Sequence, residues 1–157
     1  MRIVALSDSH GNTGALMKAV RQQPQADCFI FLGDGLDDIR YVMKEFPKRT
    51  YYAVSGNCDF TSPEPCETEL ELCGRKLFFT HGHSYFVKCG LTRIEEEAKR
   101  RGADILLFGH THKALCEYVN GLYVMNPGSI GLPDGGRPTY GIIDITTAGI
   151  AAHIAEE

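Results

Sequence analysis

The sequence lacks the features that mark membrane, nucleic-acid-binding and exported proteins. No apolar run approaches the length needed to cross a bilayer, and because the chain opens directly on an apolar strand we expect no signal peptide. The formal net charge of −4 provides no basic field for a nucleic-acid backbone. We therefore expect a cytoplasmic protein with no membrane partner and no stable nucleic-acid binding.

Signs of a disulfide framework and of a phosphate-binding loop are also missing. The six cysteines include no CxxC pair, and 157 residues are enough to bury a real core. We therefore expect reduced thiols and a single domain spanning residues 1–157. Because the patterns GxxxxGKS/T and GxGxxG are absent, the segment Gly33-Asp34-Gly35 is not expected to cradle a phosphate.

What the sequence does contain is one pattern repeated five times, an apolar run followed by Asp, Asn or His. The five runs end at Leu6, Leu32, Val54, Thr80 and Phe108. Apolar runs without a polar break are typical of strands buried on both faces of a parallel sheet. Ligands of such sheets bind beyond the carboxyl ends of the strands. We therefore predict that the polar residues after these runs form one site.

Helical patterns separate the first three runs and predict a βαβαβ unit with parallel strands. The first helix is expected to be capped by Asn12 or Thr13, and the second to be closed by Pro47. Asp37 and Asp38 near the start of the second helix could be metal ligands. We favour the interpretation that they are acids near the positive end of that helix.

The second half of the chain favours antiparallel pairs. Hairpin turns are predicted at residues 73–74, 120–121 and 147–149. A third helix is expected over about residues 91–101, with Thr92 and Glu95 as a capping box and three i,i+4 ion pairs on a solvated face. Parallel units followed by hairpins indicate two packed sheets with helices outside.

The polar residues at the strand ends have the chemistry of a metal site. The candidates are Asp8, His10, Asp34, Asn57, His81, His110 and His112. Four imidazoles, two carboxylates and one amide oxygen, with no thiolate, suit Mn, Fe, Co, Ni or Zn. Seven ligands are too many for one tetrahedral ion, so we expect two ions with Asp34 bridging them. Five of the six histidines lie in these motifs, and only His153 does not.

The ordered motifs resemble those of the calcineurin-like metallophosphoesterase superfamily, and in particular its branch of small cytosolic phosphodiesterases. The motifs are Asp8-x-His10, Gly33-Asp34, Gly56-Asn57-x-Asp59, His81 and Gly109-His110-x-His112. The resemblance implies an α/β fold, a four-layer α/β/β/α sandwich of two mixed sheets flanked by helices. It also implies two ion sites, one held by Asp8, His10, Asp34 and His112 and the other by Asp34, Asn57, His81 and His110.

Two such ions would hold a bridging hydroxide that attacks a phosphoester in line. We expect manganese or nickel, with iron, cobalt or zinc as alternatives. Many family members have histidine where Cys58 stands, and a thiol is a poor general acid near neutral pH. His83 could substitute for that histidine or be merely structural. Cys58 and Asp59 are further candidates for an acid or supporting role.

A phosphodiesterase is the favoured interpretation. Diesters are expected to be better substrates than monoesters, because Lys113 is the only lysine or arginine that adjoins the ligand motifs. One alternative is a non-catalytic interaction scaffold, since a retromer subunit shares this fold. The intact set of seven ligands argues against it. Another is a monoesterase or nucleotide hydrolase with the same metal site. The sequence does not decide between a monomer and a homo-oligomer.

Overall fold

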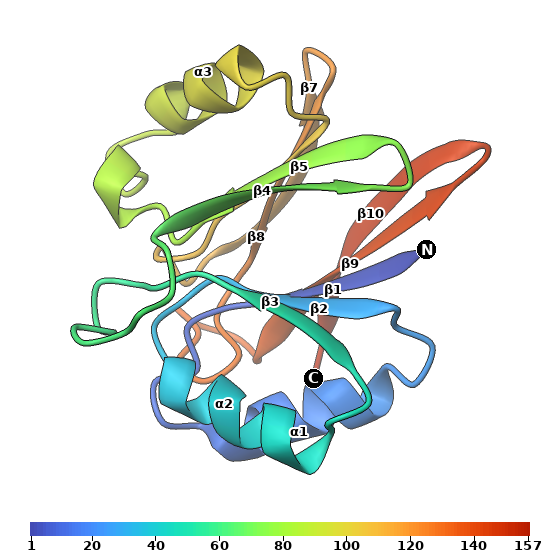
Figure 1. Cartoon of the computed structure of the whole chain (residues 1–157). Coiled ribbons are helices and arrows are strands. Elements are labelled where there is room, and N and C mark those ends of the chain that lie inside the picture. The colour runs from blue at the N-terminus through green and yellow to red at the C-terminus, as the bar shows by residue number, and fades with distance from the viewer.

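The computed structural model describes residues 1–157 and contains two five-stranded sheets that lie face to face (Figure 1). The first sheet has the strand order β10 (Gly149–Glu156), β9 (Thr139–Thr146), β1 (Arg2–Leu6), β2 (Cys28–Phe31) and β3 (Thr50–Ala53). The second has the order β4 (Glu67–Leu72), β5 (Arg75–Thr80), β6 (Ile105–Leu107), β8 (Leu122–Pro127) and β7 (Ala114–Val119). The helices are α1 (Thr13–Gln22), α2 (Leu36–Glu45), the short 3-10 helix η1 (His83–Tyr85) and α3 (Thr92–Arg100).

Both sheets are mixed, with a parallel centre and antiparallel additions. Strands β1, β2 and β3 are parallel, so the predicted βαβαβ unit is confirmed. Strands β5, β6 and β8 are also parallel. The three predicted hairpins join β4 to β5, β7 to β8 and β9 to β10. Because parallel strands end at the same edge of a sheet, each sheet presents its strand ends together.

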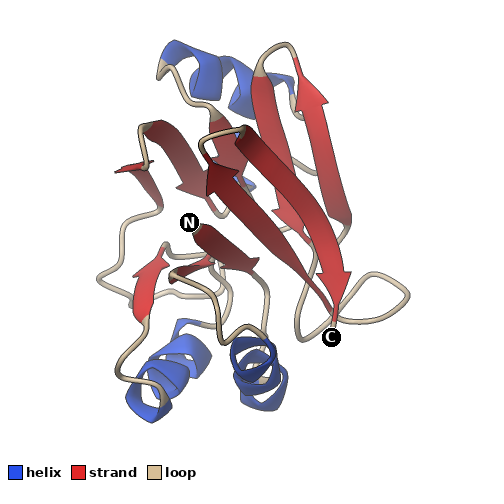
Figure 2. Cartoon of the chain, turned by 90° about the vertical axis from the view of Figure 1, so that its right-hand side faces the viewer, coloured by secondary structure: helices blue, strands red, loops and turns tan.

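Three apolar clusters fill the spaces between four layers, and the predicted α/β/β/α sandwich is confirmed. Successive side chains of a strand point to opposite faces. In β1, Val4 and Leu6 therefore pack with α1 and α2, whereas Ile3 and Ala5 pack in the cluster shared with the second sheet. On the far side, Phe78 of β5 belongs to the cluster that holds α3. Figure 2 shows the helices on the two outer sides of the sandwich.

The capping residues at the starts of the helices agree only in part with those predicted from the sequence. Asn12 caps α1 as predicted, because its side chain accepts a hydrogen bond from the amide of Ala15 at 3.1 Å. The predicted capping box of α3 is wrong. Leu91 occupies the N-cap position and no side chain caps this helix. Thr92 is already the first helical residue, so its hydroxyl does not stand where a capping group must.

The charged face of α3 is less solvated than predicted. Of the three expected i,i+4 pairs, only Glu97–Arg101 forms, at 2.6 Å. Arg101 also pairs with Glu67 and Glu69 of β4 and lies over the ring of Phe78, 4.3 Å from its centroid. These contacts hold α3 against the second sheet and leave the Arg101 side chain only 16% exposed. None of the helices has the length and hydropathy of a membrane span.

Candidate metal centre

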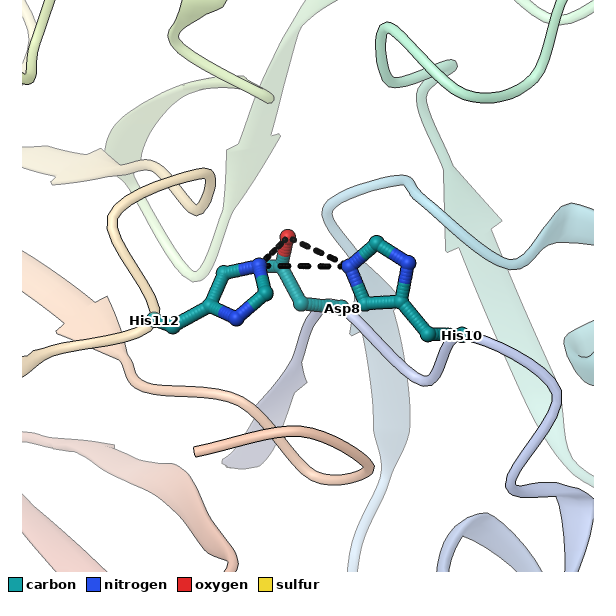
Figure 3. Close-up of side chains that lie close together, drawn as sticks. All are labelled: Asp8, His10 and His112. Atoms are coloured by element: carbon teal, nitrogen blue, oxygen red, sulfur yellow. Dashed lines mark hydrogen bonds and ion pairs between the residues drawn. The ribbon is translucent and has the colours of Figure 1, made fainter. Parts of the chain in front are cut away.

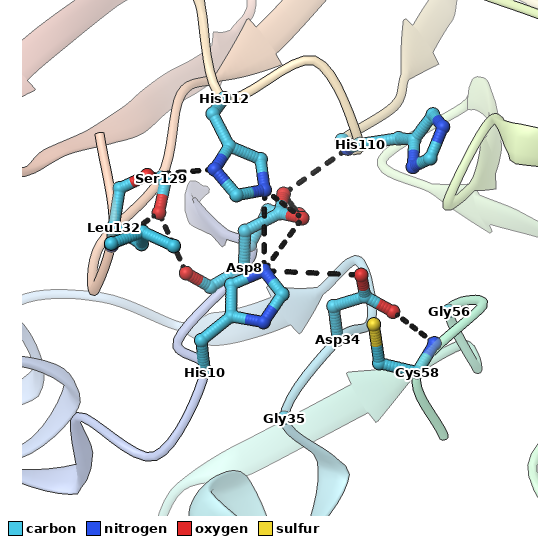
Figure 4. Close-up of polar contacts among 12 residues, drawn as sticks. Asp8, His10, Asp34, Gly35, Gly56, Cys58, His110, His112, Ser129 and Leu132 are labelled. Atoms are coloured by element: carbon cyan, nitrogen blue, oxygen red, sulfur yellow. Dashed lines mark hydrogen bonds and ion pairs between the residues drawn. The ribbon is translucent and has the colours of Figure 1, made fainter. Parts of the chain in front are cut away.

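All seven predicted ligands lie where the strand ends of the two sheets converge, and Figure 4 shows Asp8, His10, Asp34, His110 and His112 among them. They follow five parallel strands: Asp8 and His10 after β1, Asp34 after β2, Asn57 after β3, His81 after β5, and His110 and His112 after β6. Each side chain reaches the shared edge because the parallel strands of each sheet end there. The segments are far apart in the sequence, and the topology alone brings them together.

Five of the seven residues have left-handed backbone angles. The φ values are +55° at Asp8, +45° at His10, +57° at Asp34, +67° at His110 and +59° at His112. This conformation costs an L-residue roughly 1–2 kcal/mol, although Asp and His tolerate it better than most side chains. The sharp turn redirects each side chain as its strand ends. Strain of this kind is concentrated at functional sites.

Asp8, His10 and His112 form the first group of donor atoms (Figure 3). Nε2 of His112 lies 3.2 Å from Oδ1 of Asp8, Nε2 of His10 lies 3.8 Å from the same oxygen, and the two nitrogens are 3.2 Å apart. Donor atoms around a cation at about 2.1 Å are roughly 3.0–3.4 Å from one another. Oδ1 of Asp8 is buried and has no hydrogen-bond partner, which suits an oxygen that binds a cation.

Asp34, Asn57, His81 and His110 form the second group. Nε2 of His81 lies 3.4 Å from Oδ2 of Asp34 and 3.2 Å from Oδ1 of Asn57. The donor atoms of Asp34, His81 and His110 all lie within 4.8 Å of one another. Oδ2 of Asp34 is also 3.9 Å from Nε2 of His10. This carboxylate therefore borders both groups, as a bridging ligand would.

Hydrogen bonds to backbone carbonyls fix which ring nitrogen faces the site. Nδ1 of His81 donates to the carbonyl of Leu32, and Nδ1 of His112 donates to the carbonyl of Leu132, each at 2.7 Å. Because Nδ1 carries the proton of each neutral ring, Nε2 points a lone pair at carboxylate or amide oxygens. Two groups that can only accept hydrogen bonds repel each other unless a proton or a cation lies between them. The residues present therefore fit a metal.

The two carboxylates are ionised despite their burial. Burial opposes ionisation of Asp34, but the neighbouring His81 imidazole and the Cys58 amide outweigh it and lower the pKa of Asp34 to about 2. Burial likewise opposes ionisation of Asp8, yet His10 and His112 hold the pKa of Asp8 below its usual range. No lysine or arginine forms an ion pair with either carboxylate. The centre is thus an anionic site enclosed by imidazoles.

Lys88 is a neighbour of the site that the sequence did not indicate. It follows η1 and lines the same cavity as His112. Burial is the largest cause that lowers the pKa of His110 to about 4, and the charge of Lys88 adds to it, so His110 is neutral at pH 7. Lys88 forms no ion pair, whereas Lys113 is paired with Asp134 at 3.1 Å.

Asp59 holds the backbone that presents Asp34. One carboxylate oxygen accepts from the amides of Gly35 and Leu36, each at 3.0 Å, and the other from the amides of Asp34 and Gly56, each at 2.8 Å. A side chain at Gly56 would collide with the Asp34 carboxylate, so glycine allows this close approach. With both oxygens occupied, Asp59 has the geometry of a positioning residue.

Asp38 anchors the loop that carries His10. Its carboxylate accepts from the amide of Gly11 at 2.8 Å and from the hydroxyl of Thr13 at 2.7 Å. Its interpretation as a helix-terminal acid alone was therefore incomplete. Asp37, by contrast, has a side chain that is 98% exposed and pairs only with Arg40, so it does not reach the site. A sequence pattern does not distinguish two adjacent acids in this way.

Ser129 and Asn126 support the ligand segments from β8 and the turn that follows it. The hydroxyl of Ser129 donates to the carbonyl of Asp8 at 2.7 Å (Figure 4). The side-chain amide of Asn126 donates to the carbonyl of Gly109 at 2.9 Å. Both side chains are fully buried. The sequence analysis assigned no role to either residue.

Cys58 and His83 lie beside the site. The amide of Cys58 donates to Oδ1 of Asp34 at 2.7 Å, and burial followed by a hydrogen bond with Asp34 raises the pKa of the Cys58 thiol to about 11. Nδ1 of His83 is buried without a partner, and the His83 ring centroid is 5.4 Å from that of His81. Burial lowers the pKa of His83. Because its pKa is raised, the Cys58 thiol is a poor proton donor near neutral pH.

The chain matches known proteins over nearly its whole length. A family model described as the calcineurin-like phosphoesterase superfamily domain matches residues 1–148. The probable metallophosphoesterase YsnB of Bacillus subtilis is 37% identical over 134 residues, which cover 85% of this chain and 77% of that protein. The phosphodiesterase YfcE of Escherichia coli is 29% identical over 169 residues, which cover 92% and 88%.

Solved structures share the fold. An uncharacterized protein of Streptococcus pneumoniae TIGR4, described as a predicted phosphoesterase, has a TM-score of 0.85 at 25% identity, over 99% of this chain and 88% of that one. Vacuolar Protein Sorting 29 from Cryptosporidium parvum has a TM-score of 0.76 at 18% identity, over 99% and 97%. The second likeness shows the fold alone.

Proposed function

The chain belongs to the calcineurin-like phosphoesterase superfamily, and from that premise we propose that it is a divalent-metal-dependent phosphodiesterase with two ions per chain. The observation that carries this proposal is the paired set of unsatisfied acceptors. Oδ1 of Asp8 has no hydrogen-bond partner, and the Nε2 atoms of His81 and His112 face oxygens that can only accept. Asp34 lies between the two sets.

We assign the ligands to two ions that share Asp34. Asp8, His10 and His112 would complete one ion site, and Asn57, His81 and His110 would complete the other. Support comes from the 3.2–3.8 Å spacings within the first group and the 3.2–3.4 Å spacings of His81 in the second. Borderline donors favour manganese, nickel or related ions over magnesium.

When bound, two divalent ions would supply a hydroxide nucleophile at neutral pH and neutralise charge on the phosphoryl oxygens. The contribution of the chain is to hold the donor atoms in place beforehand. The carbonyls of Leu32 and Leu132 orient the rings of His81 and His112 so that the lone pairs face the site. Asp59 keeps the strained turn at Asp34 closed.

Two other functions share this geometry. A scaffold that binds metal without catalysis has the support of the Vacuolar Protein Sorting 29 likeness, which extends to the fold only. A monoesterase has the support of Lys88, because an unpaired cation beside the site favours a dianionic substrate over a monoanionic one. The phosphodiesterase interpretation is preferred since the relative YfcE carries that name.

The test begins with protein stripped of metal by a chelator and reloaded with manganese, nickel, cobalt or zinc. Elemental analysis should find about two ions per chain. Hydrolysis of bis(p-nitrophenyl) phosphate should return with manganese or nickel and exceed that of p-nitrophenyl phosphate. His110→Ala should lose metal and activity together, whereas His153→Ala, which alters an exposed residue of β10, should keep both.

Three outcomes would contradict the proposal. Saturation at one ion with full activity would remove the dinuclear site. Two bound ions without hydrolysis of any phosphoester would favour the scaffold. Faster hydrolysis of the monoester than of the diester would favour the monoesterase.

A further inference from the structure

A groove opens beside the candidate metal centre. Its volume is about 730 Å³, and His112 forms part of its wall. Half of its twelve lining residues are apolar, and they come from the segment after η1, the residues around β6 and β7, and the 132–134 turn. Leu132 is 59% exposed and lies next to the His112 ring in Figure 4. The groove is therefore continuous with the centre.

The charge of the groove suits an anion that carries an apolar group. Lys88 and Lys113 both line it, but Lys113 is engaged with Asp134. Lys88 makes no ion pair and shares the lining of the groove with His112. An exposed and unpaired cation next to a metal centre is positioned to attract a negatively charged ester toward it.

The dimensions admit a ring or a larger group. Pockets for small molecules typically hold about 300–1,000 Å³ and combine an apolar lining with a few polar groups, as this groove does. A single free lysine in a chain with a net charge of −4 gives no track for a nucleic-acid backbone. The apolar wall offers the side chains of Leu132 and Leu115 to a flat ring, and Lys88 lies in the same wall.

Building on the proposed function, we propose that this groove binds an aromatic or heteroaromatic group attached to the phosphorus of the substrate, and that Lys88 attracts the anion. The enzyme then prefers phosphodiesters with a ring-bearing ester group over those with small alkyl groups. Leu132 is a specificity residue in this arrangement. Its backbone carbonyl holds His112 while its side chain covers the groove.

The test uses two phosphonates, phenylphosphonate and methylphosphonate, which carry the same anionic group and are not hydrolysed. Their affinities for the metal-loaded protein are measured by calorimetry, so the result does not depend on turnover. In the wild type, phenylphosphonate should bind at least about tenfold more tightly, because one partly buried ring contributes an effect of that order.

Two variants separate the apolar wall from the cation. Leu132→Ala should reduce the phenyl preference by about 5- to 10-fold, because it shortens the wall while leaving the carbonyl that holds His112. Lys88→Met should weaken both phosphonates by a similar factor, about 3- to 10-fold, and leave the preference unchanged. Tyr41→Ala and Lys44→Met, which alter exposed side chains of α2, are the matched controls.

Equal affinity of the wild type for the two phosphonates would overturn the inference, and so would a phenyl preference that survives in Leu132→Ala. An unaltered affinity in Lys88→Met would remove the lysine from it. If phosphonates bind with the expected preference but no phosphoester is hydrolysed, the proposed function fails while the groove assignment stands. If diesters are hydrolysed without any phenyl preference, the groove assignment alone fails.

Discussion

Replacing Asp59 with alanine should destabilise the protein and weaken metal binding without removing any metal ligand. The carboxylate accepts four backbone hydrogen bonds, from the amides of Asp34, Gly35, Leu36 and Gly56. A hydrogen bond to a charged group contributes about 1.5–3 kcal/mol, so four would give about 6 kcal/mol at the lower end. Because Asp59 is only half-buried, water can replace part of this. We expect a loss of about 3–4 kcal/mol in the free energy of unfolding.

Urea unfolding of the metal-free protein measures the first effect, and calorimetric titration with Mn²⁺ measures the second. Loss of a residue that supports a metal ligand typically costs about 10–100-fold in metal affinity, and we expect a value in that range. Asp59→Asn should not rescue either property, since it keeps one acceptor oxygen but turns an NH₂ group toward the other pair of amides. Asp37→Ala is the control, because its side chain is 98% exposed.

Surface ion pairs such as Asp37–Arg40 contribute about 0–1 kcal/mol, so the control should change little. The reasoning fails if Asp59→Ala unfolds at the same urea concentration as Asp37→Ala and binds Mn²⁺ as the wild type does. It also fails if Asp59→Asn binds Mn²⁺ as tightly as the wild type, because an amide with one acceptor oxygen would then suffice where the carboxylate accepts four hydrogen bonds.

Three further outcomes are expected. Asp34→Asn should lose more metal and activity than Asp8→Asn by elemental analysis and diester hydrolysis, because Asp34 borders both groups; two tightly held ions in that variant would exclude it as the bridge. In a series of diesters, the hydrolysis rate should fall steeply as the pKa of the leaving group rises, in wild type and Cys58→Ser alike. If the rate of the wild type hardly depends on that pKa and the rate of His83→Ala depends on it steeply, His83 is a general acid, which typically contributes about 10²–10⁴-fold. Hydrogen bonds from neighbouring arginines lower the pKa of Glu97 to about 2. Glu97→Gln should therefore cost stability in urea above about pH 5, and the difference from wild type should shrink steadily as the pH falls toward 2. A difference that is undiminished at pH 2 would contradict this.

The layers of the fold could be predicted because their signals are local. Unbroken apolar runs marked β1, β2 and β6, and helical periodicity marked α1 and α2. The general tendency of parallel sheets to bind ligands beyond their carboxyl ends then led to the residues that now lie together. That step needed no knowledge of the contacts between the two sheets.

Apart from the capping box of α3, the failed or missing predictions concern residues whose partners are distant in the sequence. Arg101 was assigned to a solvated helix face, yet its partners Glu67 and Glu69 lie on another element more than thirty positions away. Lys88 was overlooked because it reaches the groove through the path of the segment after η1, which carries no periodic signal. Asp59 was noted for its spacing, but the four amides it binds could not be read from that spacing.

The groups that hold the candidate ligands in strained conformations lie outside the ligand set. Asp8 and Asp34 keep left-handed angles that cost roughly 1–2 kcal/mol each. The offsetting contacts are the Ser129 hydroxyl on the Asp8 carbonyl and the Asp59 carboxylate on the Asp34 amide. These contacts fix the backbone beside both carboxylates, so the fold itself directs the acceptors toward one another. We expect such preorganisation to reduce the ordering of loops that metal binding would otherwise require.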